Sequence, residues 1–511
     1  MSGPIQVEGG IGGTAVGLQS LEVAALQLAS ADAELGGTLA RVVAVATDPD
    51  LLLSAALSPT TAVRVEVTLA SVVSPGGLAG RVAELSALAS ATVLATATYR
   101  EVEREVTVMA DATHDAVMFA VGWCAPEIAV GALALDALGV DLASTADHAV
   151  FALPALAELG GGTAGLAAGL TADPLTAPLI RGGGSSWPSH GQGRSTSTDS
   201  PNSLGRPGRP GRPDGPDSPR SPGSPGSPGD GYDESLRILA DSAVAWGLLD
   251  DGGRAWVTME AAARDGAEAP TSLESLAADT LNVADADAYP GHVRVVEVPG
   301  LHGSSWVVQI SGTQVWSPRA GDNPLDVTTD VRSMARESTV LAQAVDEALR
   351  QAKADSGRDA SADPVLLSGH SLGGIAAAGL AASPQFTARH HVTHVVTMGS
   401  PVSRVPVPPG IQVMSLEHSQ DPVPRLEGRR NPDRQHWVTV TRDLHGDPHG
   451  VDTASGAHAA AEYLETAAMV DASQDRSVQG WRAGSGHFFE PRPGSVPVIR
   501  DFRIARIPAD R

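Results

Sequence analysis

The hydrophobic pattern of the chain changes in character about halfway along its length. In residues 14–108, Ala, Leu and Val recur with helical spacing and do not alternate as they would in strands. Asp48-Pro49-Asp50, Ser58-Pro59 and Ser74-Pro75-Gly76-Gly77 interrupt this pattern where helices are expected to end. Residues 1–110 are therefore predicted to form a helical hairpin or small bundle.

A more apolar segment follows at residues 111–181. Residues 116–135 are nearly all apolar, which raises the alternative of a membrane span. Pro126 and Glu127 lie at the centre of that run, and a charge is costly there in lipid. A membrane span is therefore disfavoured, and the segment is predicted to be an apolar helical region of small residues.

The composition changes abruptly between residues 182 and 231. Gly, Ser, Pro and Arg dominate this segment, as in the run Arg206-Pro207-Gly208-Arg209. Such a composition buries too little apolar surface to offset the entropy lost on ordering. Residues 182–231 are predicted to be a disordered linker, with contact between its arginines and an acidic partner as the alternative.

Residues 232–511 show strand-like and helix-like patterns in alternation. Residues 331–350 carry apolar side chains on one face of a predicted helix. Strand-like runs surround it at residues 292–298, 306–310, 394–398, 411–416 and 437–441. This alternation predicts the α/β class: a mostly parallel sheet with helices on both faces and a site at the carboxyl ends of the strands.

Residues 364–374 contain the motif that bears most directly on chemistry. An apolar run leads into Gly369-His370-Ser371-Leu372-Gly373, and an alanine-rich helical segment follows. This strand–turn–helix order is the context of a nucleophile elbow, in which Gly369 and Gly373 leave room for a tight turn and the Ser371 hydroxyl is exposed. The pentapeptide alone also arises by chance in a chain rich in Gly and Ser, so a plain structural turn is the alternative.

A catalytic serine needs a histidine that removes its proton and a carboxylate that orients the histidine. In this fold the chain order is serine, acid, histidine. Asp421 is the preferred acid because it directly follows a predicted strand, and a turn cap before Pro422 is its structural alternative. Glu417 and Asp443 are the competing carboxylates.

Four histidines follow Asp421 closely enough to be considered. His436 begins a predicted strand, and His445 and His449 lie in a loop of Gly, Asp and Pro. His458 stands where a loop meets a helix, so it is the preferred base and His449 is the second choice.

The oxyanion of the reaction needs two backbone N–H groups. One is expected from Leu372, directly after the nucleophile. The second is expected from the loop Ser311-Gly312-Thr313 at the end of an earlier strand, where the Thr313 hydroxyl can add a hydrogen bond. A simple strand-ending turn is the alternative for this loop.

These motifs together resemble the class 3 lipases. In chain order they are Gly312-Thr313, the helix at residues 331–350, Gly369 to Gly374, Gly399-Ser400-Pro401 and Asp421-Pro422-Val423-Pro424. The resemblance covers residues 290–470, with Ser311 where the family usually has Arg. It implies an α/β-hydrolase fold within residues 232–511. It also implies a lid at residues 316–329 whose Trp316, Pro318 and Leu325 face an acyl chain, with a plain surface loop as the alternative.

The N-terminal region is similar to the helical-hairpin proteins exported by type VII (ESX) systems. Tyr99-Arg100-Glu101-Val102-Glu103 fits their Tyr-x-x-x-Asp/Glu export signal near the end of a second helix, although Pro75-Gly76-Gly77 replaces the usual Trp-x-Gly turn. The resemblance implies export without a Sec signal and a small helical secretion partner. Residues 1–4 show no basic start of a Sec signal, and a cytoplasmic location is the alternative.

Charge and cysteine content narrow the function classes. The net charge is −24, which disfavours binding to nucleic acid over most of the surface. Cys124 is the single cysteine, so it cannot form an internal disulfide, and a buried, unreactive thiol is expected. No Cys/His cluster has the spacing of a zinc site, and neither a metal nor a cofactor is expected.

The sequence thus predicts a serine carboxylester hydrolase, lipase- or esterase-like, that acts on an acyl ester or lipid. An exported phospholipase or toxin and an acyltransferase are variants of this chemistry. A non-catalytic interaction protein with a degenerate hydrolase domain is the alternative from another class.

Overall fold

The computed structural model describes residues 5–54, 57–123, 142–172, 230–260, 269–283, 290–301 and 303–508. Three sequence predictions fall outside this described part. They concern Cys124, residues 124–135 of the apolar run, and the linker predicted at residues 182–231, of which only the last two residues are described.

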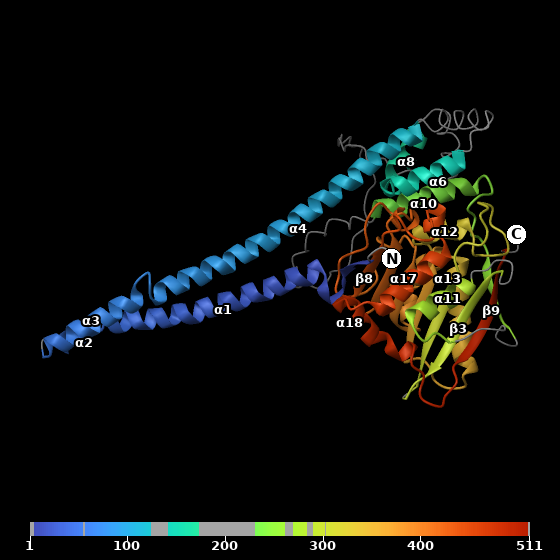
Figure 1. Ribbon diagram of the computed structural model, residues 1–511. Helices are drawn as coiled ribbons and strands as arrows, with labels where there is room; N and C mark the ends of the chain where they lie inside the picture. Colours follow the sequence, from blue (N-terminus) through green and yellow to red (C-terminus); the bar gives the residue numbers. More distant parts are fainter. Residues whose placement is uncertain are drawn as a thin grey trace, which may run out of the picture.

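A nine-stranded sheet forms the centre of the described part (Figure 1). Its order is β1-β8-β7-β6-β5-β4-β3-β9-β2, in which β4 to β8 run parallel and the remaining neighbours run antiparallel. The strands are β1 (Ile5–Gly9), β2 (Arg254–Met259), β3 (His292–Pro299), β4 (Ser304–Ile310), β5 (Pro364–His370), β6 (His391–Met398), β7 (Gln412–His418), β8 (Trp437–Arg442) and β9 (Val498–Ile507). The predicted α/β class with a parallel core is confirmed.

Helices cover both faces of the sheet, because the parallel strands are apolar on both sides. Val365 and Leu367 point into one core and Leu366 into the other, as the alternation of a strand requires. The first core lies under α13 (Val340–Asp355) and α14 (Leu372–Ala382). The second lies under α11 (Leu273–Asn282), α17 (Ala460–Ala472) and α18 (Arg476–Ser485).

Three outer strands were not predicted. β1 pairs antiparallel with β8, so the first described residues belong to the sheet and the helical half begins only after them. β2 and β9 pair with each other, and β9 also pairs with β3. All three strands pair with segments that are distant or non-adjacent in sequence, which a local pattern does not reveal. The other domain limits stay predictions.

The single helix predicted at residues 331–350 is wrong in its extent. The structure has two helices there, α12 (Val327–Met334) and α13. Arg336 separates them in the left-handed region, with φ of 57°. The Thr339 hydroxyl then accepts from the N–H of Ala342 at 3.2 Å and starts α13.

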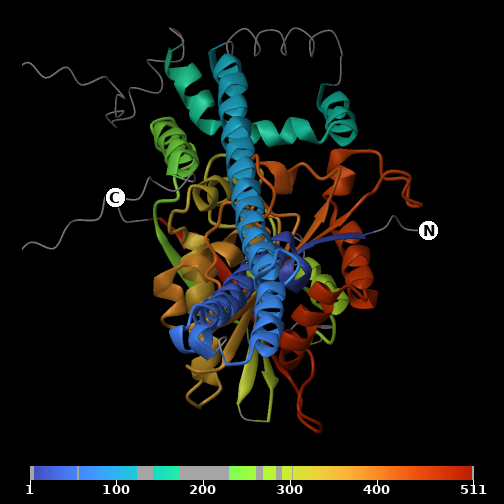
Figure 2. The same cartoon turned by 90° about the vertical axis from the view of Figure 1, so that its left-hand side faces the viewer.

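The N-terminal half is helical, as predicted. Its elements are α1 (Thr14–Ala46), α2 (Pro49–Ser54), α3 (Pro59–Val73), α4 (Leu78–Trp123), α6 (Leu142–Ala152), α7 (Ala155–Glu158) and α8 (Thr163–Ala172). The breaks fall at the predicted Pro and Gly positions. α1 and α4 project as a long pair, and α4 leads back to α6 and α8 above one end of the sheet, beside α10 (Asp230–Val244) (Figures 1 and 2).

Two sequence expectations concern this helical half. The segment from Tyr99 to Glu103 lies in the interior of α4, not near the end of a helix.

Within the described ranges, one stretch, Pro59–Phe119, is long and apolar enough to span a membrane by length and composition alone, and 6% of its most apolar window is buried. One helix that passes this test by length and composition alone does not establish a span, so the expectation of no membrane span stays a prediction.

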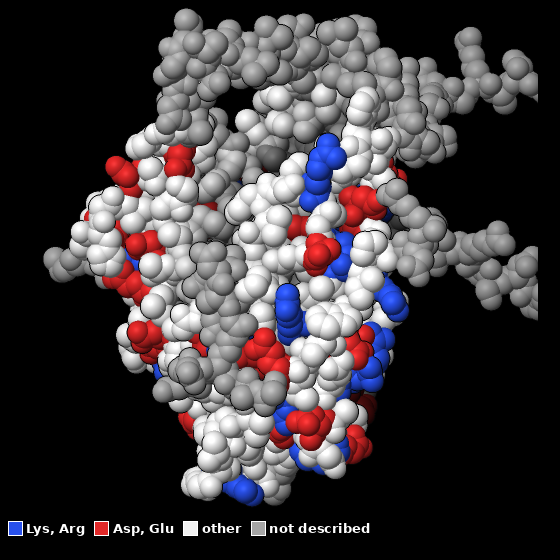
Figure 3. Space-filling model, turned by 90° about the vertical axis from the view of Figure 1, so that its right-hand side faces the viewer, with Lys and Arg blue, Asp and Glu red and all other residues white. Residues whose placement is uncertain are grey.

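The charged residues on the face drawn in Figure 3 are mixed in sign. Red side chains are spread over the described part of that face, and blue side chains lie mostly along its right-hand side, with red ones among them. The absence of a nucleic-acid partner stays a prediction from the net charge.

Candidate active site

Ser371 lies at a strained turn between β5 and α14. Its φ of 53° and ψ of −122° lie in a region that side chains other than glycine rarely adopt. The Ser371 N–H donates to the carbonyl of Met398 at 2.9 Å, which ties the turn to the end of β6. The turn therefore has the backbone of a nucleophile elbow.

The glycines around Ser371 are required by close backbone contacts. A Cβ atom on Gly369 would lie 2.0 Å from the carbonyl carbon of Gly373, and one on Gly373 would lie 2.1 Å from the carbonyl oxygen of Ile310. A Cβ on Gly374 would lie 2.0 Å from the Ser400 hydroxyl. The spacing of small residues in the motif thus lets β4, β5 and the start of α14 approach one another.

Asp421 and His458 are joined by a hydrogen bond. Nδ1 of His458 lies 2.7 Å from Oδ2 of Asp421, and the Tyr463 hydroxyl donates to the same oxygen at 2.6 Å. The N–H of Val423 donates to Oδ1 at 2.8 Å. Burial alone would raise the pKa of Asp421, but the His458 imidazole and these hydrogen bonds outweigh it and lower that pKa. Asp421 is therefore held as a carboxylate.

Of the four histidines considered, His458 is the one that contacts Asp421. His449 is 60% exposed and lies near Asp447 and Glu462 instead. His445 pairs with Asp443 at 2.9 Å on the surface, and His436 is buried at the start of β8. The structure thus brings together the two residues preferred from chain order.

The competing carboxylates have other partners. Glu417 is half-buried and accepts from the Asn431 amide at 2.5 Å. Asp443 accepts from Gln420 at 2.7 Å. Neither carboxylate has a hydrogen bond to His458 among the described contacts.

His370 connects the elbow to the His458 loop, and sequence reasoning missed it. Its ring centre lies 4.7 Å from that of His458, and its Nε2 donates to the carbonyl of His458 at 3.2 Å. Burial lowers the pKa of His370 to about 3, so the ring is neutral. This contact places His458 beside the residue that precedes Ser371. The position of His370 within the elbow motif, next to Ser371, was the sequence feature that could have marked it as part of the site.

The loop after β4, where the second oxyanion donor is expected, lies against the elbow. A Cβ on Gly312 would lie 3.3 Å from Cβ of Ser371. The Thr313 hydroxyl donates to Oδ2 of Asp330 at 2.8 Å. Leu372 begins α14, where amide N–H groups have no partner within the helix.

Asp330, which sequence reasoning also missed, is an unusual carboxyl group. Desolvation raises its pKa to about 7, and Asp326 adds to this, while Thr313 and His458 oppose it. Between pH 4 and 7 the folded protein thus retains a proton that the unfolded chain has released. The contribution of Asp330 to folding stability therefore decreases as the pH rises through this interval.

We expect Asp330→Asn to be more stable than the native chain at pH 8, by about 1–3 kcal/mol, and this advantage to shrink at pH 5. The amide keeps an acceptor for Thr313 but does not ionise. Urea unfolding of both proteins at the two pH values measures the difference, and Asp322→Asn at an exposed site is the control. An advantage that does not change with pH would contradict the raised pKa.

The prediction that Leu325 of the expected lid at residues 316–329 faces an acyl chain is wrong. Leu325 is fully buried and belongs to the core beneath α13. Trp316 is 74% exposed. Val315 and Asp326 form a bridge, which holds the base of this segment. Leu325 therefore does not face a substrate.

One group within the described ranges has the composition of a metal site. Asp447, His449 and Glu462 have ligand atoms within 4.8 Å of one another. Arg442 is fully buried among them, with Nη2 2.5 Å from Asp447 and 2.8 Å from Glu465. The guanidinium already forms ion pairs with these carboxylates, which is the arrangement of a structural ion-pair network.

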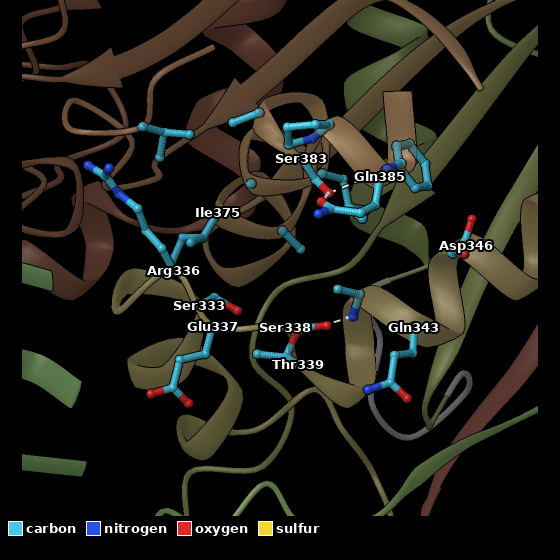
Figure 4. A pocket seen from close by; sticks show the side chains of 18 of the residues that line it. Ser333, Arg336, Glu337, Ser338, Thr339, Gln343, Asp346, Ile375, Ser383 and Gln385 are labelled. Atoms are coloured by element: carbon cyan, nitrogen blue, oxygen red, sulfur yellow. Dashed lines mark hydrogen bonds between the residues drawn. The ribbon is translucent and has the colours of Figure 1, made fainter. Parts of the chain in front are cut away.

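Two hollows lie near these elements. The first, of about 500 Å³, is bounded by α13, α14 and α15 (Pro384–Thr387), and Figure 4 shows Arg336, Ile375 and Ser383 around it. The second, of about 640 Å³, lies between α6, α7 and the loops that carry Asp421 and His458. The first is lined by neither of those loops.

Comparison with known proteins gives one family match. The model of the PGAP1-like alpha/beta domain matches residues 325–446, which is less than half of the chain and includes Ser371 and Asp421. No curated protein and no solved structure matches the chain. Nothing in these comparisons supports the type VII resemblance of the N-terminal half. Residues 325–446 thus carry a PGAP1-like α/β-hydrolase domain.

Proposed function

We propose that this chain is a serine carboxylester hydrolase, with Ser371 as nucleophile, His458 as general base and Asp421 as the group that orients it. The hydrogen bond between His458 and Asp421, next to a strained serine in an elbow, is the observation that carries the proposal. A hydrolase-family domain over residues 325–446 supports an ester as the substrate.

The contacts of His458 define its part in the reaction. Its Nδ1 carries the proton donated to Asp421, so Nε2 is the free base that removes the Ser371 proton. The serine oxygen attacks the acyl carbonyl, and His458 then protonates the leaving alcohol. Water attacks the resulting acyl-enzyme by the same steps and releases the acid.

The negative oxygen of each tetrahedral intermediate needs nearby donors. The N–H groups of Leu372 and Thr313 are proposed for this role, because Gly312 packs against Ser371 and α14 begins at Leu372. The raised pKa of Asp330 keeps this carboxyl largely protonated below pH 7, which limits negative charge beside Thr313.

The order of motifs along the chain supports a lipase-like enzyme within this class. The loop of Gly312-Thr313, the elbow, Gly399-Ser400-Pro401 and the Asp421 loop follow one another as in class 3 lipases. Gly399 has φ of 58°, and a Cβ there would lie 3.0 Å from Asp421 Oδ2, so this motif also belongs to the site. The proposal includes an exported phospholipase and an acyltransferase as variants of the same chemistry. The domain limits predicted from the sequence are part of the proposal as well.

The proposal is tested by labelling the purified chain with a fluorophosphonate, followed by mass spectrometry of its peptides. We expect one adduct, on the peptide that contains Ser371. Folded protein that does not react, with or without detergent, would overturn the enzyme reading and favour the non-catalytic interaction protein.

A further inference from the structure

The second hollow is bounded on one side by the loops that carry Asp421 and His458, although none of the proposed catalytic side chains lines it. Pro422, which follows Asp421, and Ala454, which begins the short helix before His458, both line it. The opposite wall comes from α6 and α7, more than 250 residues earlier in the chain. We call this hollow the α6–α7 groove.

The wall of the α6–α7 groove is mainly apolar. Val150 and Ala157 line it from the helices, and Pro422, Leu426 and Ala454 line it from the loops. Beneath it, Phe151, Leu444, Ala454 and Ala457 form a small separate core. It is a shallow depression of about 640 Å³ that is broadly open to solvent, so a chain bound along it would keep one side in water.

Polar contacts fasten the helices to the loops on both sides of the groove. The Asp147 carboxylate accepts from the Ser455 N–H at 2.7 Å and from its hydroxyl at 2.5 Å. Glu158 forms an ion pair with Arg425. At the next turn Gly161 packs on Gly428, where a Cβ on either glycine would lie 2.7 Å from the α-carbon of the other. The apolar wall of the groove therefore lies between the Asp147–Ser455 contact and the Glu158–Arg425 ion pair.

We propose that the α6–α7 groove binds the acyl chain of the ester that Ser371 attacks. This inference rests on the proposed function. The groove offers apolar side chains, which favour an aliphatic chain. Its carboxylate, Asp147, already bonds to Ser455 and disfavours an anionic head group. The helical half then contributes part of the substrate site and selects the length of the acyl chain.

The hollow of Figure 4 does not serve this role. Its floor includes Ile375 and Gly379 on the outer side of α14, and Arg336, Glu337 and Arg389 surround it. No residue next to Asp421 or His458 lines it. It therefore provides a matched control site on the same domain.

An anchored probe locates the acyl chain directly. A long-chain alkyl fluorophosphonate with a diazirine near the end of its tail would be attached to Ser371 in the full-length chain and then photolysed. We expect crosslinks in residues 142–158 and 422–426. Crosslinks confined to residues 316–329 or to the hollow of Figure 4 would overturn the inference.

Filling the groove tests the same point by kinetics. We expect Ala157→Trp to lower kcat/KM for p-nitrophenyl palmitate by at least about tenfold and to change that for the butyrate ester less than twofold. Ala146→Trp, at an exposed lining position of α6, is a second variant in case Ala157→Trp does not fold. Gly379→Trp, in the other hollow, should leave the ratio of the two esters unchanged.

The outcomes separate this inference from the proposed function. If the native chain does not react with the fluorophosphonate, the proposed function fails and the inference fails with it. If the native chain reacts and hydrolyses both esters, but neither groove variant changes their ratio, the inference alone is wrong.

Discussion

Replacement of Ser371 by alanine is expected to lower kcat for ester hydrolysis roughly 10⁶-fold, the order of loss seen when another triad enzyme loses its nucleophile. The alanine keeps Cβ and occupies the same backbone position, so the elbow and its hydrogen bond to Met398 are retained. The loss would therefore come from the missing hydroxyl. Turnover of p-nitrophenyl butyrate by purified native and variant protein measures it.

Two controls separate chemistry from folding at this position. Ser361→Ala, on the exposed surface, should keep full activity. Ser371→Gly should be as inactive as the alanine variant but more stable, by about 1 kcal/mol in urea unfolding, because glycine adopts a φ of 53° without strain. Residual activity above about one per cent in Ser371→Ala or Ser371→Gly would point to another nucleophile.

The elements predicted well were those that depend on neighbours in sequence. The strand, the turn and the helix around Gly369 to Gly374 follow one another within one short segment, so the elbow was predictable. Asp421 follows its strand directly, and the Pro and Gly breaks of the helical half are local as well. The split of the predicted helix at Arg336 was not, because its apolar residues keep a helical period across the break.

The parts that sequence could not predict depend on contacts between distant residues. Asp147 and Ser455 are 308 positions apart, so no pattern places α6 beside the His458 loop. Tyr463 reaches Asp421 across 42 positions and Asp330 reaches Thr313 across 17. These side chains are ordinary in their own segments, and the fold gives them their role.

The second large effect is expected from Asp421→Asn. Oδ1 of Asp421 accepts from the Val423 N–H, and Oδ2 accepts from both His458 and Tyr463. An asparagine has one acceptor oxygen and one donor group. The backbone N–H of Val423 cannot change direction, so the amide oxygen is expected to face it and the NH₂ group to face His458 and Tyr463.

This orientation keeps a hydrogen bond from residue 421 to each of its three neighbours but reverses the role of His458. The Tyr463 hydroxyl can turn to accept from the amide, and His458 accepts at Nδ1 only if its proton moves to Nε2. The protonated Nε2 can no longer take the proton of Ser371. We therefore expect Asp421→Asn to fold normally and to lose about 10⁴-fold in kcat, the size of loss that the wrong tautomer causes in another triad enzyme.

Tyr463→Phe is the comparison that isolates the tautomer. It removes one of the two hydrogen bonds to Oδ2 but leaves the carboxylate and the Nδ1 proton of His458 in place, so about a tenfold loss or less is expected. Steady-state kinetics of both variants at pH 8, with urea unfolding to check their stability, measure the difference. If both variants lose activity to the same extent, orientation of the Asp421 carboxylate by its neighbours, and not the tautomer of His458, is what the site requires.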